Sequence, residues 1–171
     1  MVTEVGVRRI GPDDWTLWRG LRLAALADAP DAFGSSSAVE REFDEDEWRA
    51  RLAPEHGLRA VAFAGQTPAG IVGGRPPAGS PPHVELVGMW VHPDARGGET
   101  ARLLVGEVLA WAGEQGCPAV SLFVTETNDR ARRLYERFGF AGTGEWEPLE
   151  SNPVLRCARM IRTAGLVPHP G

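Results

Sequence analysis

Apolar residues recur at helical spacing in several segments of the chain. The first segment begins after Asp13 and Asp14, which suit a helix N-terminus, and it ends before Pro30. A shorter segment begins at Asp44, a typical N-cap residue, and continues to about Leu52. These patterns predict two helices in the N-terminal third of the chain, separated by a break rich in glycine and serine.

The C-terminal half contains two further helical segments. Thr100–Gln115 places alanine, leucine and valine on one face, and Gly116 follows as a typical helix-ending residue. Asn128 can cap a shorter helix over Asp129–Arg137. With the two segments nearer the N-terminus, the pattern predicts about four helices.

Alternating or continuously apolar runs predict strands between these helices. The expected strands are Val5–Ile10, Arg59–Ala64, Ala69–Gly74, His83–Val91, Ala119–Val124, Phe140–Gly144 and Val154–Ile161. The second and third of them form a hairpin, and a loop rich in proline and glycine follows over residues 76–82. Gly88 interrupts a strongly apolar strand, which indicates a bulge or a close approach to the backbone there, or simply room for core packing.

The order of these elements predicts one mixed α/β domain over residues 1–162 and a loose tail over residues 163–171. A length of 171 residues, 43% of them hydrophobic, suits a single core. The longest apolar runs are too short to span a bilayer, and the N-terminus lacks the pattern of a secretory signal. We therefore expect a cytoplasmic protein with no membrane partner.

Charge and cysteine usage narrow the function classes further. The net charge of −5 argues against nucleic acid as a partner. All 18 basic residues are arginine, a bias typical of a GC-rich genome. Cys117 and Cys157 lie far apart without metal-ligand spacing, so we expect two reduced thiols and no metal site.

The most informative junction is the glycine-containing loop between the strand at His83–Val91 and the helix that begins at Thr100. Free backbone N–H groups and the helix dipole make such a junction a candidate anion site. The spacing and the lysine of a nucleotide-binding phosphate loop are absent. Taken alone, the loop is compatible with an anion site or with a plain structural turn.

Two motifs in order carry a family resemblance. The run VHPDARGGETARLL over residues 91–104 resembles the coenzyme-A signature of the GNAT superfamily of N-acyltransferases, in which V-x-P leads into R-G-x-G-x-A/G and a helix. The run NDRARRLYERFGF over residues 128–140 resembles that family's N-x-x-A-x-x-L-Y-E-x-x-G-F. The resemblance covers about residues 84–140.

The resemblance implies both a fold and an activity. The fold is a mixed, mostly antiparallel sheet of six to seven strands flanked by about four helices, with a splayed strand pair that holds acetyl-CoA. The activity is transfer of an acetyl group to a primary amine of a small molecule or peptide, by direct attack in a ternary complex. A homodimer is usual in the family. The alternative is a degenerate, non-catalytic domain that binds acyl-CoA.

The motif residues imply the following cofactor contacts. The backbone amide of Met89 would polarise the acyl carbonyl, and Val91 would bind the pantetheine arm through its backbone. The loop and the first helical turn would hold the pyrophosphate with Arg96, Gly97, Gly98, Glu99, Thr100 and Ala101.

Three more residues receive roles from the resemblance. Tyr135, the chain's only tyrosine, would protonate the departing thiolate or anchor its helix as packing. Asn128 would bind the cofactor and cap the same helix. Glu85 matches a general-base position, although a strand glutamate can equally be a solvated surface residue.

Two features leave alternatives open. Glu99 stands where the signature has its second glycine; its carboxylate would either repel the pyrophosphate or interact with the helix dipole while only its amide faces the phosphate. Residues 13–52 and 145–153 correspond to the acceptor-binding segments. Their acidic residues would attract a cationic amine or would only be solvated.

Overall fold

The computed structural model describes residues 3–117 and 119–163. Within them, one seven-stranded sheet is accompanied by five α-helices. The elements are β1 Val5–Arg9, α1 Trp15–Asp28, α2 Ser37–Glu40, α3 Glu45–Arg51, β2 Leu58–Ala64, β3 Thr67–Ala78, β4 His83–Val91, α4 Thr100–Glu114, β5 Ala119–Thr125, α5 Asp129–Arg137, β6 Ala141–Leu149 and β7 Asn152–Thr163.

The sheet has the strand order β1-β2-β3-β4-β5-β7-β6. Every neighbouring pair is antiparallel except β4 and β5, which are parallel. Only Val84 with Val120 and Glu85 with Ser121 join those two strands, and beyond this point they separate. The predicted fold class, a mostly antiparallel mixed sheet with a splayed strand pair, is confirmed, with five α-helices where about four were expected.

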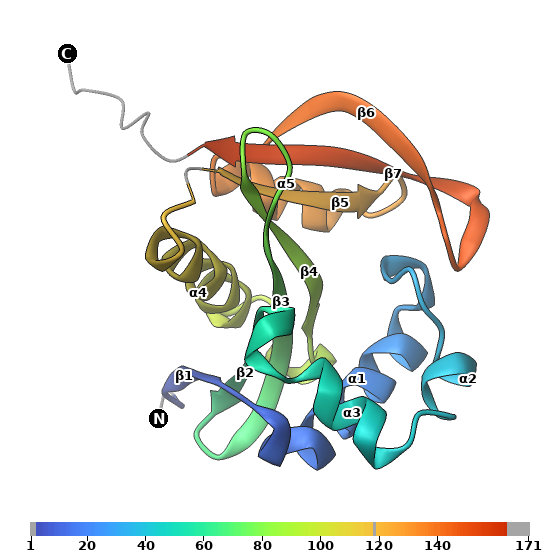
Figure 1. Cartoon of the computed structure of the whole chain (residues 1–171), viewed down its shortest axis with the longest axis vertical. Coiled ribbons are helices and arrows are strands. Elements are labelled where there is room, and N and C mark those ends of the chain that lie inside the picture. The colour runs from blue at the N-terminus through green and yellow to red at the C-terminus, as the bar shows by residue number, and fades with distance from the viewer. Residues whose placement is uncertain (1–2, 118, 164–171) are drawn as a thin grey trace.

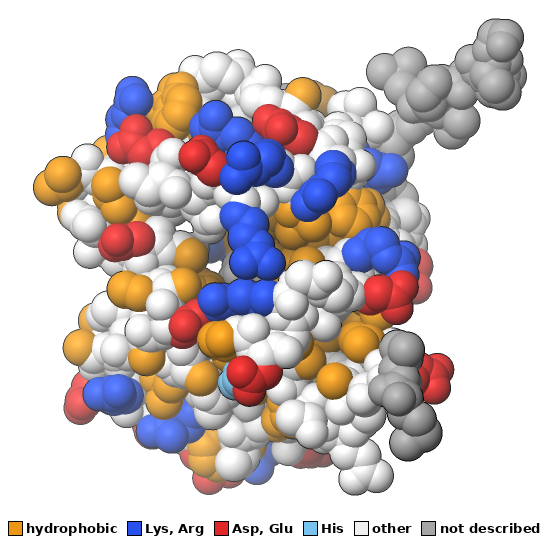
Figure 2. All heavy atoms as spheres, turned by 180° about the vertical axis from the view of Figure 1, so that it is seen from behind, with side chains coloured by type: hydrophobic (Ala, Val, Ile, Leu, Met, Phe, Trp, Pro, Cys, Tyr) orange, Lys and Arg blue, Asp and Glu red, His pale blue; other side chains and the backbone are white. Residues whose placement is uncertain are grey.

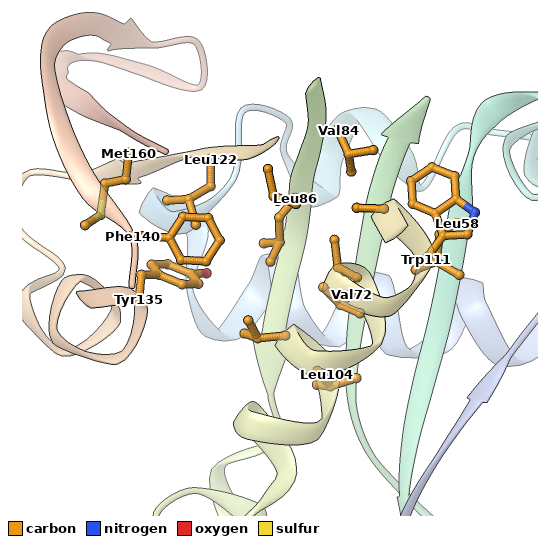
Figure 3. Packing of buried hydrophobic residues seen from close by; sticks show 14 of the residues in the cluster. Leu58, Val72, Val84, Leu86, Leu104, Trp111, Leu122, Tyr135, Phe140 and Met160 are labelled. Atoms are coloured by element: carbon orange, nitrogen blue, oxygen red, sulfur yellow. The ribbon is translucent and has the colours of Figure 1, made fainter. Parts of the chain in front are cut away.

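Helices cover both faces of the first half of the sheet (Figure 1). On one face, α4 packs Leu104 and Trp111 onto β2–β4 (Figure 3). On the other face, α1 and α3 bury Trp18 and Trp48 against Val61 of β2 and its neighbours. Two separate cores thus hold the first four strands flat between helical layers, which gives the splayed edge of β4 a rigid support.

Local sequence signals place the helices as predicted. The carboxylate of Asp44 accepts a hydrogen bond from the backbone N–H of Glu47 at 2.9 Å, and the carboxylate of Glu47 accepts one from the backbone N–H of Asp44 at 3.1 Å, a reciprocal N-terminal cap. Asn128 caps α5 by accepting from the amide of Ala131 at 3.1 Å. The short helix α2 lies in and just after the predicted break, where Ser36 caps it.

Strand lengths were predicted less well. β3 runs to Ala78, into the predicted loop, because Arg75 and Ala78 pair with β4 across an irregularity in the ladder. β6 and β7 extend to Leu149 and Asn152, so most of the segment expected to be an acceptor loop is paired strand. Pairing with a neighbour decided these ends, and the local composition did not indicate it.

The chain end departs by one residue from its expected boundary. Thr163 closes β7, whereas the tail was expected to begin there, and the remaining tail residues 164–171 lie outside the described residues. None of the helices in the described ranges is long and apolar enough to cross a membrane.

Candidate active site

A bulge in β4 lies at the centre of the site. Gly88 has a φ of +61°, in the region that favours glycine. The β3 ladder pairs Gly73 with Val87 and Ile71 with Trp90, so Gly88 and Met89 fall outside its register. The predicted bulge is confirmed, and it interrupts β4 on the stretch that β5 has left unpaired.

The separation of β4 from β5 opens a cavity of about 1510 Å³. It is lined by β4, by the loop before α4, by α5 and by segments of α1–α3. Figure 2 shows arginine side chains gathered across the middle of one face of the molecule, beside a hollow. The cavity therefore runs between the two halves of the sheet and reaches both motif segments.

The loop ahead of α4 offers a row of free backbone donors. Gly97 has a φ of +83°, and α4 begins at Thr100. In the described part of the chain, the backbone N–H groups of Gly97 through Arg102 donate no hydrogen bond to a protein acceptor. The first N–H group of α4 to do so is that of Leu103, which donates to the carbonyl of Glu99. Consecutive free N–H groups at a helix N-terminus form an anion-binding concavity. The geometry favours the anion site over the plain turn.

The two arginine side chains of this loop are engaged within the protein. Arg96 donates through its Nε to the carbonyl of Val91 at 3.1 Å, and its guanidinium also binds Asp28 at the end of α1. Arg102 donates to the carboxylate of Glu99 at 2.8 Å. The backbone amides, more than these guanidinium groups, are therefore the donors left open.

Glu99 occupies the N-cap position of α4. Its carboxylate lies three residues before Arg102 and pairs with it on an exposed surface. Glu99 is not among the residues that line the cavity, whereas Arg102 lines it. The ion pair with Arg102 partly neutralises the Glu99 carboxylate, which lessens the repulsion that this carboxylate would exert on a bound anion.

Tyr135 of α5 is buried and also borders the cavity. Its ring packs edge-on against Phe140 at 5.8 Å between centroids, near Leu122 and Met160 (Figure 3). Burial raises the pKa of the Tyr135 phenol above its ordinary value of 10.0. The hydroxyl makes no hydrogen bond within the described part of the chain, so a protonated donor remains available.

Asn128 and Glu85 are also on the cavity wall. The Oδ1 of Asn128 is used in the α5 cap, which leaves its amide nitrogen free for another partner. The carboxylate of Glu85 accepts a hydrogen bond from Arg75 at 2.7 Å across the β3–β4 pair. Glu85 thus lines the cavity while it is paired with Arg75. Met89 and Val91 line the same wall.

Several acidic side chains that were expected to form a cation-attracting rim instead bind other groups within the protein. Glu40 is buried against Arg22, Asp44 and Glu47 form a helix cap, and Glu45 pairs with Arg49. From the acceptor segments, only three acids line the cavity: Glu40, Glu147 and Glu150. Among the described residues that line it, eight arginines outnumber four glutamates, so this wall is predominantly basic.

Several residues of the site were not predicted from the sequence. Arg22, Asp28 and Arg59 received no role, because each lies in an apolar helix or strand whose pattern indicated only packing. The one available signal was Arg59 itself, a charged residue inside the apolar run LRAVAFA of β2. A charge in such a run is unusual enough to mark a position for inspection.

The similarity of this sequence to known proteins identifies its family. The sequence matches the profile of the Acetyltransferase (GNAT) family over residues 23–140. That match covers more than half of the chain and includes both motif segments. The protein belongs to the GNAT family of acetyltransferases.

Two curated relatives are moderately similar in sequence. An uncharacterized N-acetyltransferase of Schizosaccharomyces pombe is 33% identical over 105 residues, which is 61% of this chain and 62% of that protein. The mycothiol acetyltransferase of Salinispora arenicola is 34% identical over 143 residues, 78% of this chain and 43% of that protein. The alignments thus span less than two thirds of either relative.

Solved structures share the fold at lower sequence identity. A GNAT acetyltransferase from Streptococcus pneumoniae has a TM-score of 0.77 at 20% identity, covering 95% of this chain and all of that one. A putative acetyltransferase of Salmonella typhimurium, solved with its cofactor acetyl-CoA, has a TM-score of 0.73 at 20% identity and covers 98% of each chain.

Proposed function

We propose that this protein transfers an acetyl group from acetyl-CoA to the primary amine of a small molecule or peptide, by direct attack while both are bound. One observation carries the proposal: in the row of free amides over Gly97–Arg102, those of Gly97, Gly98, Ala101 and Arg102 belong to residues that border the same cavity as the bulged edge of β4. These groups fit a carrier with a phosphorylated end and an amide-containing arm. Family membership supports the same reaction.

Each residue then has a chemical task. Bound acetyl-CoA supplies a thioester carbonyl that an amine can attack. The amide of Met89, outside the strand ladder, stabilises the charge that develops on that carbonyl oxygen. The backbone of Val91 binds the pantetheine arm, while the amides of the 96–101 loop hold the pyrophosphate and the free amide nitrogen of Asn128 binds the cofactor from α5.

Proton movement depends on Tyr135 and on solvent. Burial keeps the Tyr135 phenol protonated, so it can donate to the leaving sulfur. The attacking amine must lose a proton, and Glu85 can accept it through water at Oε1, while Arg75 occupies its Oε2. The simplest scheme therefore assigns the acid role to Tyr135 and gives Glu85 a secondary base role.

Calorimetry with coenzyme A, followed by a thiol-release assay over a panel of amines, tests the proposal. We expect binding with one molecule per chain, and turnover with at least one amine. Absence of coenzyme-A binding would overturn the proposal altogether.

The Arg75–Glu85 pair favours one alternative, a domain that binds acyl-CoA without catalysis, because the candidate base is engaged in the resting structure. Binding without turnover on any amine would support that alternative. Turnover that is unchanged in Glu85→Gln would instead remove Glu85 from the mechanism and leave the transferase proposal in place.

A further inference from the structure

Four arginine side chains gather in the cavity along β4, away from the amide loop. They come from two layers of the fold: Arg22 of α1 and Arg51 at the end of α3 from the helical layer, and Arg59 of β2 and Arg75 of β3 from the sheet. Two of these charges have a carboxylate partner. Glu40 binds Arg22 and Glu85 binds Arg75. Arg51 stacks its guanidinium over the ring of Phe43 at 4.1 Å.

Arg59 differs from the other three because neither a carboxylate nor an aromatic ring compensates its charge in the described part of the chain. Its Nη1 donates to the carbonyl of Leu58 at 2.7 Å, and no carboxylate in the described ranges pairs with it. Burial, and then the charges of the other three arginines, lower the pKa of Arg59 to about 10. It is still a cation at neutral pH, and holding an unpaired cation in such surroundings destabilises the fold.

The position of Arg59 connects it to the bulge. A Cβ on Gly73 would lie 3.2 Å from both Cδ and Nη1 of Arg59, so the guanidinium stem occupies the space above that glycine. Gly73 is the register partner of Val87, the residue immediately before Gly88. The free cation therefore lies beside the strand position next to the proposed reaction centre.

Arg22 approaches the same centre from the opposite layer. Its Nε and Nη2 bind the buried carboxylate of Glu40, at 3.0 Å and 2.9 Å in the shorter contacts. Its Nη1 lies 3.2 Å from the place a Cβ on Gly88 would occupy, and no acceptor in the described part of the chain receives it. One guanidinium edge is thus fixed by Glu40 while the other remains free beside the bulge.

We propose that the amine acceptor carries its own anionic group, a carboxylate or a phosphate a few bonds from the amine, and that Arg59 and the free edge of Arg22 bind it. This inference rests on the proposed acetyl transfer, because the bulge is what places the amine. A planar guanidinium donates two parallel hydrogen bonds to either group. Amino acids and aminoalkyl phosphates fit this description, whereas a polycationic amine would be repelled by the arginine side chains.

Matched acceptors test the charge requirement directly. The acceptors are serine against serinamide and O-phosphoethanolamine against ethanolamine, together with spermidine, in a thiol-release assay with saturating acetyl-CoA. We expect kcat/KM to favour the anionic member of at least one pair by about tenfold to a hundredfold, the worth of a hydrogen bond to a charged group. The preferred pair distinguishes a carboxylate from a phosphate. A preference for spermidine or for both neutral members would overturn the inference and leave acetyl transfer intact.

Variants add two readouts that do not depend on turnover, the affinity for coenzyme A and the unfolding temperature. Arg59→Leu should lose the preference for the anionic acceptor mainly through KM, keep its affinity for coenzyme A, and unfold at the same or a higher temperature than wild type. Arg8→Leu, an exposed β1 arginine outside the cavity lining, serves as the matched control and should keep the preference.

Binding separates the two possible failures. If no amine is acetylated, the transferase proposal fails, and calorimetric titration of serine and O-phosphoethanolamine into the complex with coenzyme A then decides the inference alone. Binding of either one that Arg59→Leu weakens about tenfold supports the anion site. No binding of either, or binding unchanged in Arg59→Leu, overturns it.

Discussion

Arg96 in the loop ahead of α4 donates to the carboxylate of Asp28, the last residue of α1. The indole Nε1 of Trp90 donates to the same carboxylate oxygen at 3.0 Å. Asp28 therefore joins the end of an acceptor-side helix to β4 and to the loop whose amides are free. The proposed cofactor loop takes its shape partly from the layer that faces the acceptor.

Replacing Asp28 by Asn should loosen this loop. The Trp90 hydrogen bond, and then that of Arg96, lower the pKa of Asp28 below its ordinary value of 3.8. A lowered carboxyl pKa stabilises the fold above the ordinary value, and this stabilisation is lost as the pH falls through the lower folded value. We expect Asp28→Asn to lower Tm by about 3 °C at pH 7, with the difference shrinking as the pH falls below the ordinary carboxyl value of 3.8.

The same variant should raise KM for acetyl-CoA severalfold, measured in the thiol-release assay. Asp13→Asn, which removes a carboxylate paired with Arg49 away from the loop, is the matched control. An equal change in KM for both variants would mean that the contact between Asp28 and Arg96 does not shape the cofactor loop.

Alanine at Gly88 should impair turnover by straining the bulge in β4. A φ of +61° is strained for a residue with a Cβ, and that Cβ would stand 3.2 Å from Nη1 of Arg22. We expect a loss of stability of about 1 kcal/mol and a fall in kcat of about tenfold or more. Gly106→Ala, in mid-α4 with open space around it, should instead stabilise the protein and leave kcat unchanged.

Removing the hydroxyl of Tyr135 isolates its proposed acid role. The hydroxyl has no protein partner in the described ranges, so Tyr135→Phe should keep Tm and the coenzyme-A affinity near wild type. We expect kcat to fall by about ten- to a hundredfold. Rates compared at saturating substrate, together with thermal unfolding, check this; unchanged kcat would leave Tyr135 as packing against Phe140 only.

Glu99→Gln tests whether the carboxylate opposes the cofactor. The substitution removes a negative charge beside the free amides and releases Arg102. We expect coenzyme-A affinity to rise about twofold to fivefold in low salt and to return towards wild type in high salt, because the charges are exposed. Glu107→Gln, which removes a charge from the same helix by breaking the ion pair of Glu107 with Arg9 of β1, should leave the affinity unchanged.

Much of the fold was predicted from local sequence patterns. Features that depend on a few adjacent residues were predicted from the sequence. They are the strand His83–Val91, the helix Asp129–Arg137, the caps at Asp44 and Asn128, and the bulge at Gly88. The two motifs likewise indicated the family. The ends of β3, β6 and β7 were not predicted, since pairing with a distant strand decides where a strand ends.

The sequence by itself therefore determined the family and the loop whose amides are free to bind an anion. Only the tertiary structure decided how the charges near that loop and bulge are used. It engages Arg96 with Asp28, pairs Glu85 with Arg75, buries Glu40 on Arg22 and leaves Arg59 without a carboxylate. The reason is that ionic pairing depends on distances between side chains far apart in the chain, and those distances are set by how the layers pack.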